Sequence, residues 1–210
     1  MEKAKENVIE DTTWQVPLDM IEPAERINQR TITVGVQMLS EFSEMPVYST
    51  DDAACFDLRA CLKSKVNKGT ADCIRKIKIF RRDNTLVDSA ININPQEPFS
   101  YVVGAGERAL IPTGLIFDIP GNCSIRLHPR SGNALKYGIT LGNAEGVIDS
   151  DYTLETYVMV HNTSDAHWYV KHGDRICQGE IVENTMALFR EVDYVTTESN
   201  RKGGFGSTGT

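Results

Sequence analysis

The sequence lacks the features that mark several special classes of protein. Its 210 residues contain no apolar run that approaches the roughly 18 residues of a membrane-spanning helix. The first residues, MEKAKENVIEDTTWQ, include no apolar segment, so we expect no secretory signal. The 5 cysteines are odd in number and contain no CxxC pair, which argues against a zinc site or a disulfide framework. Reduced thiols in a cytoplasmic protein are the simpler interpretation.

The sequence also has fewer basic than acidic residues. The chain has 22 Lys and Arg residues against 29 Asp and Glu residues, which gives a net charge of -7. Proteins that bind nucleic acid or an anionic membrane surface usually present an excess of basic residues. We therefore expect no direct nucleic-acid partner and no membrane partner, although a local group of basic side chains could still bind a phosphorylated small molecule. At 40% hydrophobic residues, the chain is apolar enough and long enough to bury a core.

From Thr31 onward, most of the chain consists of short runs in which apolar residues alternate with polar ones. In TITVGVQML (31–39), Ile32, Val34 and Val36 recur with a period of two, which is typical of a half-buried strand. Only RSGNALKYGI (130–139) resembles a short helical turn. Many short strands and little helix predict an all-β sandwich, jelly roll or barrel. Similar runs, separated by Gly, Pro, Asn or Asp, occupy 74–80, 85–93, 101–114, 115–120, 123–129, 157–162, 167–173 and 175–183.

Three segments differ from this pattern and define the expected organisation around a β-domain at 31–195. Residues 1–30 are polar and acidic, which indicates an N-terminal arm with little structure. Residues 63–98 contain the basic stretch IRKIKIFRR and the turn RDNT, which predict a hairpin with a charged, exposed face that could form a basic patch. Residues 196–210 end in RKGGFGSTGT, which is too poor in apolar surface to offset the entropy of ordering itself. A frayed terminus would explain that tail as well.

Two stretches carry residues suited to binding phosphate. HPRSGNALKYG (128–138) places Arg130, Ser131 and Gly132 where a strand gives way to a helical turn. A guanidinium, a hydroxyl and free backbone N–H groups could bind a phosphate there, but an N-capping serine beside a surface arginine explains these residues equally well. In HGDRICQGEI (172–181), the polar Gln178 lies inside an apolar run, either as a structural hydrogen-bonding group or as a ligand contact.

Two further stretches place carboxylates among apolar residues. In LGNAEGVIDSDY (141–152), NAEG can form a hairpin turn, and Asp149 follows two apolar residues, so partial desolvation could raise its basicity. With Asn143 and Tyr152 nearby, this stretch suits either a small-molecule pocket with a carboxylate base or a satisfied Asp-rich turn. Asp57, in DDAACFDLRAC (51–61), is at least as compatible with capping a turn as with a functional role.

In this order, FDLRAC, PRSG, GVIDSDY, GDRICQ and the tail motif GGFGSTG closely resemble the motifs of the trimeric dUTPase family, the dUTP nucleotidohydrolases. The resemblance covers about residues 31–210, apart from the segment near 63–98. It implies a jelly-roll-like β-barrel subunit and a homotrimer with three active sites at its interfaces. It also implies hydrolysis of dUTP to dUMP and pyrophosphate with Mg²⁺, a reaction that keeps uracil out of DNA and supplies dUMP for dTMP synthesis.

The resemblance also implies roles for the residues of these motifs. Asp149 is expected to orient and deprotonate the attacking water, and Tyr152 to lie under the deoxyribose and exclude a 2′-hydroxyl. Asp57 is expected to act on Mg²⁺ through water, and through Arg130. The residues expected to read the uracil edge, by side chain or backbone, are Asn143, Gly146, Val147 and Ile148.

The phosphates and the lid complete the set of residues that the resemblance implies. The expected phosphate ligands are Arg130, Ser131 and Gly132 from a neighbouring subunit, together with Gln178. The tail is expected to be a flexible lid that closes over a neighbouring active site and excludes water. In it, Phe205 would stack on the uracil, Gly206 would allow close approach of the backbone, and Arg201 and Ser207 would contact the γ-phosphate.

The sequence departs from the family pattern at several points. Asn200 stands where an arginine is usual, five residues before the tail phenylalanine, and it is left open whether Arg201 takes over that role from the next position. Leu154 stands where glycine is usual, and Asn133 where an apolar residue is common. Between Leu62 and Tyr101 the chain is about 35 residues longer than typical members, which suggests an extra hairpin over the nucleotide site or on the rim of the trimer.

Two other functions fit parts of the same evidence. A dCTP deaminase, or a bifunctional relative, shares the fold and a PRS motif, but it uses a glutamate three residues before an asparagine. Counting back from Asn162 gives Met159, which is unsuited to that proton transfer. A regulatory role, in which the 63–98 insert binds a partner protein, would be an addition to catalysis, since the catalytic motifs are intact.

Overall fold

The computed structural model describes residues 31–65, 72–87, 93–94 and 96–200. The predicted N-terminal arm and the last ten residues of the predicted lid lie outside them. The chain divides into two compact units, Met1–Thr33 and Val34–Thr210, and the helix and strands below all belong to the second. Among the described residues, no helix is long and apolar enough to cross a membrane.

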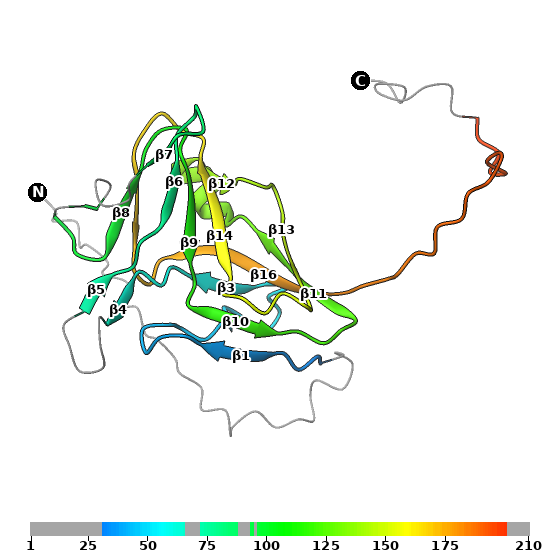
Figure 1. Ribbon diagram of the computed structural model, residues 1–210, viewed down its shortest axis with the longest axis horizontal. Coiled ribbons are helices and arrows are strands. Elements are labelled where there is room, and N and C mark those ends of the chain that lie inside the picture. Colours follow the sequence, from blue (N-terminus) through cyan, green and yellow to red (C-terminus); the bar gives the residue numbers. More distant parts are fainter. Residues whose placement is uncertain (1–30, 66–71, 88–92, 95, 201–210) are drawn as a thin grey trace, which may run out of the picture. The chain divides into compact units, whose positions relative to one another are not determined.

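The described part of the second unit consists almost entirely of short strands with one helix (Figure 1). This confirms the all-β prediction. The elements are β1 (Gly35–Met38), β2 (Val47–Tyr48), β3 (Phe56–Arg59), β4 (Lys63–Lys65), β5 (Asp72–Ile74), β6 (Lys78–Phe80), β7 (Leu86–Val87), β8 (Ser100–Val103), β9 (Arg108–Pro112), β10 (Leu115–Asp118), β11 (Cys123–His128), α1 (Ser131–Tyr137), β12 (Ile139–Leu141), β13 (Gly146–Asp149), β14 (Tyr157–Asn162), β15 (Trp168–Lys171) and β16 (Arg175–Glu183).

Two five-stranded sheets form the jelly-roll-like framework. One has the order β13-β11-β16-β3-β2 and the other the order β12-β14-β9-β6-β7, and within the described residues the pairs β1-β10, β15-β8 and β4-β5 stand apart from them. All the pairings named here are antiparallel, so alternate side chains of a strand point to the same face. In β14, Val158, Val160 and Asn162 are buried while the residues between them are not. The alternation seen in the sequence therefore marks the faces that pack into the core.

Strand β11 lies between β13 and β16 and positions two groups of predicted site residues. On one side it pairs with β13, where Ser124 lies opposite Asp149. On the other side it pairs with β16, where His128 lies opposite Gln178, and Gln178 in turn lies opposite Asp57 of β3. Residues far apart in the sequence are thus placed in fixed positions of one sheet.

The predicted helical turn is α1, an exposed helix of 7 residues. Its N-cap residue is Arg130, not Ser131, and no side chain caps its first turn. Gly138 ends the helix in the left-handed conformation (φ 66°), which glycine adopts without strain. None of the helix residues is buried, and Leu135 is 87% exposed. The helix therefore contributes almost nothing to the core of a single chain.

The inserted segment differs from the single hairpin that we expected. It forms two hairpins, β4-β5 and β6-β7, and β6 pairs with β9 inside a five-stranded sheet. Ile77, Ile79 and Val87 are buried, whereas Lys78 between them is exposed. The charged outer face was predicted correctly. The prediction missed that the apolar face is buried because β6 pairs with β9. The second hairpin is therefore part of the domain and not an appendage.

Candidate functional site

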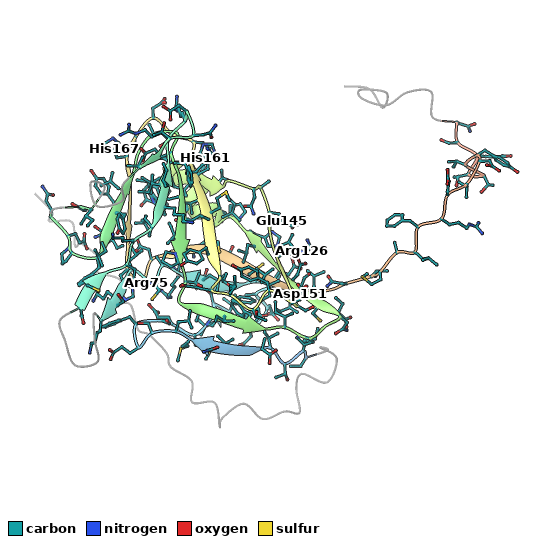
Figure 2. The ribbon with its side chains drawn as sticks, viewed as in Figure 1. Arg75, Arg126, Glu145, Asp151, His161 and His167 are labelled. Atoms are coloured by element: carbon teal, nitrogen blue, oxygen red, sulfur yellow. The ribbon has the colours of Figure 1, made fainter. Side chains whose placement is uncertain are left out.

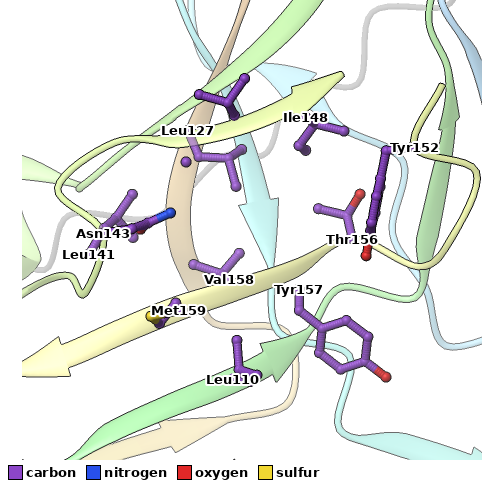
Figure 3. Close-up of a pocket in the computed structure, with 12 residues that line it drawn as sticks. Leu110, Leu127, Leu141, Asn143, Ile148, Tyr152, Thr156, Tyr157, Val158 and Met159 are labelled. Carbon is purple, nitrogen blue, oxygen red and sulfur yellow. The ribbon is translucent and has the colours of Figure 1, made fainter. Parts of the chain in front are cut away.

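A pocket of about 330 Å³ opens where strands of the two five-stranded sheets meet (Figure 3). Most of its surface is aliphatic, with a few polar groups, which is the usual composition of a small-molecule site. Figure 3 shows Asn143 at one end of this pocket and Tyr152 at the other. The lining residues are Leu110, Leu127, Leu141, Asn143, Gly146, Val147, Ile148, Tyr152, Thr156, Tyr157, Val158 and Met159.

The loop that carries Asn143 is not the hairpin turn that we predicted. Strand β12 pairs with β14, and β13 pairs with β11, so the two strands flanking the loop belong to different sheets. The loop turns sharply, with Glu145 N–H donating to the Asn143 carbonyl at 2.7 Å and Ala144 at a φ of 62°. Because each flanking strand has its partner elsewhere, the space between the sheets stays open, and this space is the pocket.

The residues predicted to bind the uracil and the deoxyribose are brought together around this pocket. Asn143, Gly146, Val147, Ile148 and Tyr152 all line it. A β-carbon on Gly146 would lie 3.0 Å from that of Leu127 on the neighbouring strand, so a larger residue would push this wall of the pocket outward. Tyr152 donates its hydroxyl to the Glu155 carbonyl at 3.0 Å, which orients its ring at the pocket edge.

Asp149 ends β13 next to the pocket, but it is exposed in the single chain. The expected partial desolvation is therefore wrong for the chain by itself. The alternation of β13 explains this, because Ile148 points inward and its neighbour must point outward. The Asp149 carbonyl accepts a hydrogen bond from Tyr152 N–H at 3.1 Å, so one tight turn joins the carboxylate to the ring.

A second group of predicted residues surrounds the buried carboxylate of Asp57. Its Oδ1 accepts a hydrogen bond from Arg130 Nε at 2.9 Å. Its Oδ2 accepts one from Ser49 Oγ at 3.0 Å and one from Arg175 Nη1 at 3.1 Å. Burial by itself would raise the pKa of Asp57, but the Ser49 hydrogen bond and the two arginines outweigh it and hold the pKa below its usual value.

The other predicted phosphate ligands lie on β16 and at the start of α1, the elements next to the Asp57 cluster. Gln178 is half-buried on β16 opposite Asp57, and Ser131 and Gly132 follow Arg130 in the first turn of α1. A β-carbon on Gly132 would meet nothing within 4 Å, so packing inside the chain does not require glycine there. None of these residues lines the pocket. The predicted site residues of one chain therefore fall into two separate groups. One group lines the pocket, and the other lies at or next to the Asp57 cluster, which we define as Ser49, Asp57, Arg130 and Arg175.

The sequence analysis assigned no role to several residues that the structure places in these groups. Arg175 lies in the motif GDRICQ, and its charge beside Gln178 was an available signal. Ser49 gave no signal, because its contact with Asp57 depends on the pairing of β2 with β3. Thr156 lines the pocket, and its Oγ1 is buried without a hydrogen-bond partner among the described residues. The tail residues Arg201, Phe205, Gly206 and Ser207 lie outside the described residues.

Asp57→Asn is expected to lower the free energy of unfolding near neutral pH by about 3 kcal/mol, because it leaves two arginines without their buried partner. The lowered pKa fixes the pH dependence. The contribution of Asp57 is complete above the unfolded-state pKa of about 3.9 and is lost as the pH falls through the lower native value. Urea unfolding of wild type and variant at a series of pH values should show the two curves converging in acid. A gap that stays constant below that range would contradict this assignment.

The described residues contain no group of three or more His, Cys, Asp or Glu side chains that could hold a metal ion by themselves. Asp57 is nevertheless compatible with an indirect role. Its carboxylate accepts three hydrogen bonds in the chain, and a carboxylate offers about four acceptor positions. One position at Oδ1 is left for a water molecule, which suits a hydrated Mg²⁺ better than direct coordination.

The chain is similar to known proteins over most of its length. A family model described as dUTPase matches residues 97–209. The deoxyuridine 5'-triphosphate nucleotidohydrolase of Rhizobium meliloti (strain 1021) is 35% identical over 187 residues, which cover 87% of this chain and 96% of that protein.

Two of the solved structures with the same fold are bacteriophage proteins. The Staphylococcus bacteriophage 80alpha dUTPase with dUPNHPP matches with a TM-score of 0.62 and 20% identity, covering 86% of this chain and 100% of that one. A mutant dUTPase from phage phi11 of S. aureus, described as coordinating a structural Mg(II) ion, matches with a TM-score of 0.57 and 17% identity, covering 79% of this chain and 100% of that one. At these identities the structural matches establish the fold.

Proposed function

The chain belongs to the dUTPase family and hydrolyses dUTP as a dUTP diphosphatase, and on this premise we propose that the pocket binds deoxyuridine while the Asp57 cluster serves the triphosphate. The observation that carries the proposal is the pocket itself. Five residues that the family motifs assign to the nucleoside converge on it from a loop, a strand and a turn.

The proposed roles follow from where each group lies in the pocket. Asn143 and the backbone of 146–148 read the uracil edge, and Tyr152 at the opposite end lies under the deoxyribose. We propose that the narrow turn at 142–145 lies too close to the base to admit a 5-methyl group, which would exclude thymine. Asp149, one tight turn away from Tyr152, orients the attacking water and takes its proton. In-line attack at the α-phosphorus needs little more than this positioning and neutralisation of charge.

The phosphate chain is proposed to bind to Arg130, Ser131, Gly132 and Gln178. The open space around Gly132 supports this, because it allows another group to approach the backbone. Mg²⁺, when bound, neutralises charge on the phosphates, and Asp57 would hold one of its water molecules through the remaining acceptor position at Oδ1. The Ser49 hydrogen bond and the two arginines around Asp57 keep that carboxylate ionised for this task.

We propose that the complete site forms between copies of the chain, in a homotrimer. Three observations support an assembly in which chains share their sites. The pocket and the Asp57 cluster share no residue, and Asp149 is exposed. The segment after β16 carries Met186, Leu188 and Phe189, each at least 90% exposed. Apolar side chains this exposed are typical of segments that pack on another chain.

The proposal for the lid rests on the resemblance, since its residues lie outside the described part of the chain. Phe205 would stack on the base, Gly206 would allow the backbone to approach the nucleotide, and Arg201 and Ser207 would contact the γ-phosphate. Arg201 lies one position later than the usual tail arginine, and its substitution would test whether it takes that role. The 5 cysteines are free thiols, which supports a cytoplasmic location. There the enzyme would keep uracil out of DNA and supply dUMP for dTMP synthesis.

The two other functions are weaker for specific reasons. A deaminase needs a carboxylate at the position of Met159, and the pocket presents a thioether there. Partner binding through the insert draws support from the exposed basic face of β6-β7, where Lys76, Lys78, Arg81 and Arg82 are exposed. Such binding would be an addition to hydrolysis, and deletion of the insert would show whether activity depends on it.

Incubation with each deoxynucleotide and with UTP in the presence of Mg²⁺ should release pyrophosphate from dUTP far faster than from dCTP, dTTP or UTP. The expected discrimination against UTP is roughly a hundredfold, which is typical where a packed site must reject one added hydroxyl. Pyrophosphate and ammonia are measured in the same reactions. Comparable rates on dTTP or UTP would contradict the proposed roles of the pocket residues in selecting base and sugar. Release of ammonia from dCTP would support the deaminase.

A further inference from the structure

An ion pair joins the inserted segment to the turn that follows β13, the strand that ends at Asp149. Arg75, which directly follows β5, donates from Nη1 to Glu155 Oε1 at 2.8 Å and from Nη2 to Glu155 Oε2 at 2.6 Å. Both side chains are largely buried, with 19% of Arg75 and 12% of Glu155 exposed. Figure 2 shows Arg75 beside β4 and β5. The two parallel hydrogen bonds fix both the position and the plane of the Glu155 carboxylate.

Glu155, whose position is fixed by Arg75, is in turn bonded to residues of the pocket. Its Oε1 also accepts a hydrogen bond from Gly114 N–H at 2.8 Å, so the carboxylate is anchored to the framework as well. Its backbone carbonyl accepts the hydrogen bond from the Tyr152 hydroxyl at 3.0 Å. The next residue, Thr156, lines the pocket and is held by hydrogen bonds to Leu115 and Thr113. The position of the Tyr152 ring is therefore tied to the position of Glu155.

Arg75 is itself held rigidly by the domain. Its backbone N–H donates to the Leu62 carbonyl at 2.8 Å, and its carbonyl accepts the hydroxyl of the fully buried Tyr101 at 2.9 Å. Burial alone would lower the pKa of Arg75, but the hydrogen bonds and charge of Glu155 outweigh it and raise the pKa above its usual value. The arginine therefore stays charged throughout the working pH range.

A buried ion pair is a poor means of adding stability, because desolvation offsets most of its attraction and apolar residues could fill the same space. What a bidentate pair does provide is a fixed orientation of both side chains. That orientation matters here because Glu155 also contacts Tyr152, the ring proposed to decide which sugar fits. A displacement of a fraction of an ångström at such a ring is enough to weaken discrimination.

We propose that Arg75, supplied by the inserted segment, is a positioning residue that holds Glu155 and thereby sets how strictly Tyr152 excludes ribonucleotides. The inference rests on the proposed role of Tyr152 under the deoxyribose. It makes the insert a part of the specificity apparatus and not only a surface addition.

The test compares Arg75→Met and Arg75→Lys with wild type, using kcat and KM for dUTP and for UTP. Arg75→Met should lower the ratio of kcat/KM for dUTP over UTP by about tenfold, a substantial part of the roughly hundredfold that such a site can achieve. Most of the change in dUTP hydrolysis should be in KM, with kcat within about twofold. Arg75→Lys keeps the charge but loses the bidentate geometry, so its ratio should fall between those of wild type and Arg75→Met.

A matched control and a second variant keep the test decisive. Arg81→Met removes an exposed arginine of the same insert, whose contact with Glu107 is 4.0 Å, and should leave the ratio unchanged. If Arg75→Met does not fold, Arg75→Met combined with Glu155→Gln removes the unpaired charge and keeps an acceptor for Gly114 N–H.

The outcomes separate the inference from the proposed function. Tyr152→Ala should lower the same ratio; if it does while the Arg75 variants do not, only the inference is overturned. If Tyr152→Ala leaves the ratio unchanged, Tyr152 does not select the sugar, and both are overturned. A loss of thermal stability in Arg75→Met with an unchanged ratio would reduce Arg75 to a structural contact and would likewise overturn the inference.

Discussion

Asp149→Asn is expected to lower kcat for dUTP by at least about a hundredfold while leaving nucleotide affinity largely intact, in line with the loss of a general base. The asparagine keeps the size of the side chain and its place at the end of β13, but it cannot accept the proton of the attacking water. Single-turnover kinetics for the chemical step, together with equilibrium binding of a non-hydrolysable dUTP analogue, separate the two effects.

Asp165→Asn is a suitable control for this variant. Asp165 is fully exposed, and its contact with Arg82 is a loose one of 3.8 Å, so the same chemical change there should leave kcat unaffected. If Asp149→Asn retains nearly normal kcat, Asp149 is not the base, and a different group must activate the water.

Deletion of residues 201–210 is expected to reduce kcat/KM for dUTP by at least about a hundredfold, with the fold and the oligomeric state unchanged. Four glycines and a few small polar residues add little to a core, so stability should not suffer. Catalysis should suffer because Phe205, Arg201 and Ser207 would no longer cover the nucleotide and exclude water. Phe205→Ala should reproduce part of the loss, since stacking on one base is worth roughly 1–3 kcal/mol.

Mixing two inactive forms tests whether the tail reaches a neighbouring chain. Subunits without the tail keep Asp149, and Asp149→Asn subunits keep the tail. If lids act between chains, mixed assemblies should regain activity wherever an intact tail meets an intact base. Subunit exchange is verified with differently tagged chains and native mass spectrometry. Exchange without any recovery of activity would show that the lid closes on its own chain.

Much of the pocket could be anticipated from the sequence because its residues lie close together along the chain. Asn143, Ile148 and Tyr152 fall within ten residues, so one loop, one strand and one turn bring them to the same place whatever the rest of the fold does. The strands were recognisable for a similar reason, because the alternation of β14 reports directly which of its residues are buried. Short-range patterns of this kind survive in any compact arrangement.

The errors arose where the outcome depends on strand pairing. NAEG has the composition of a hairpin turn, but β12 and β13 pair with strands of different sheets. The insert has the pattern of a charged hairpin, but β6 completes a sheet beside β9. Asp149 follows two apolar residues, but its place in the alternation points it to solvent. Local composition cannot decide between such alternatives, because the partner of each strand is set by distant residues.

The sequence by itself determined the functional groups of this protein: the carboxylate, the tyrosine, the arginine–serine–glycine run and the glycine-rich tail are recognised by residue type and spacing. Only the tertiary structure decided which of these groups lie together in a site. Asp57 meets Arg130 and Arg175 across 73 and 118 positions of sequence, and Arg75 meets Glu155 across 80. Such pairs depend on the packing of whole sheets, because a hydrogen bond tolerates only a few tenths of an ångström of displacement and no local pattern can specify a distance between remote strands.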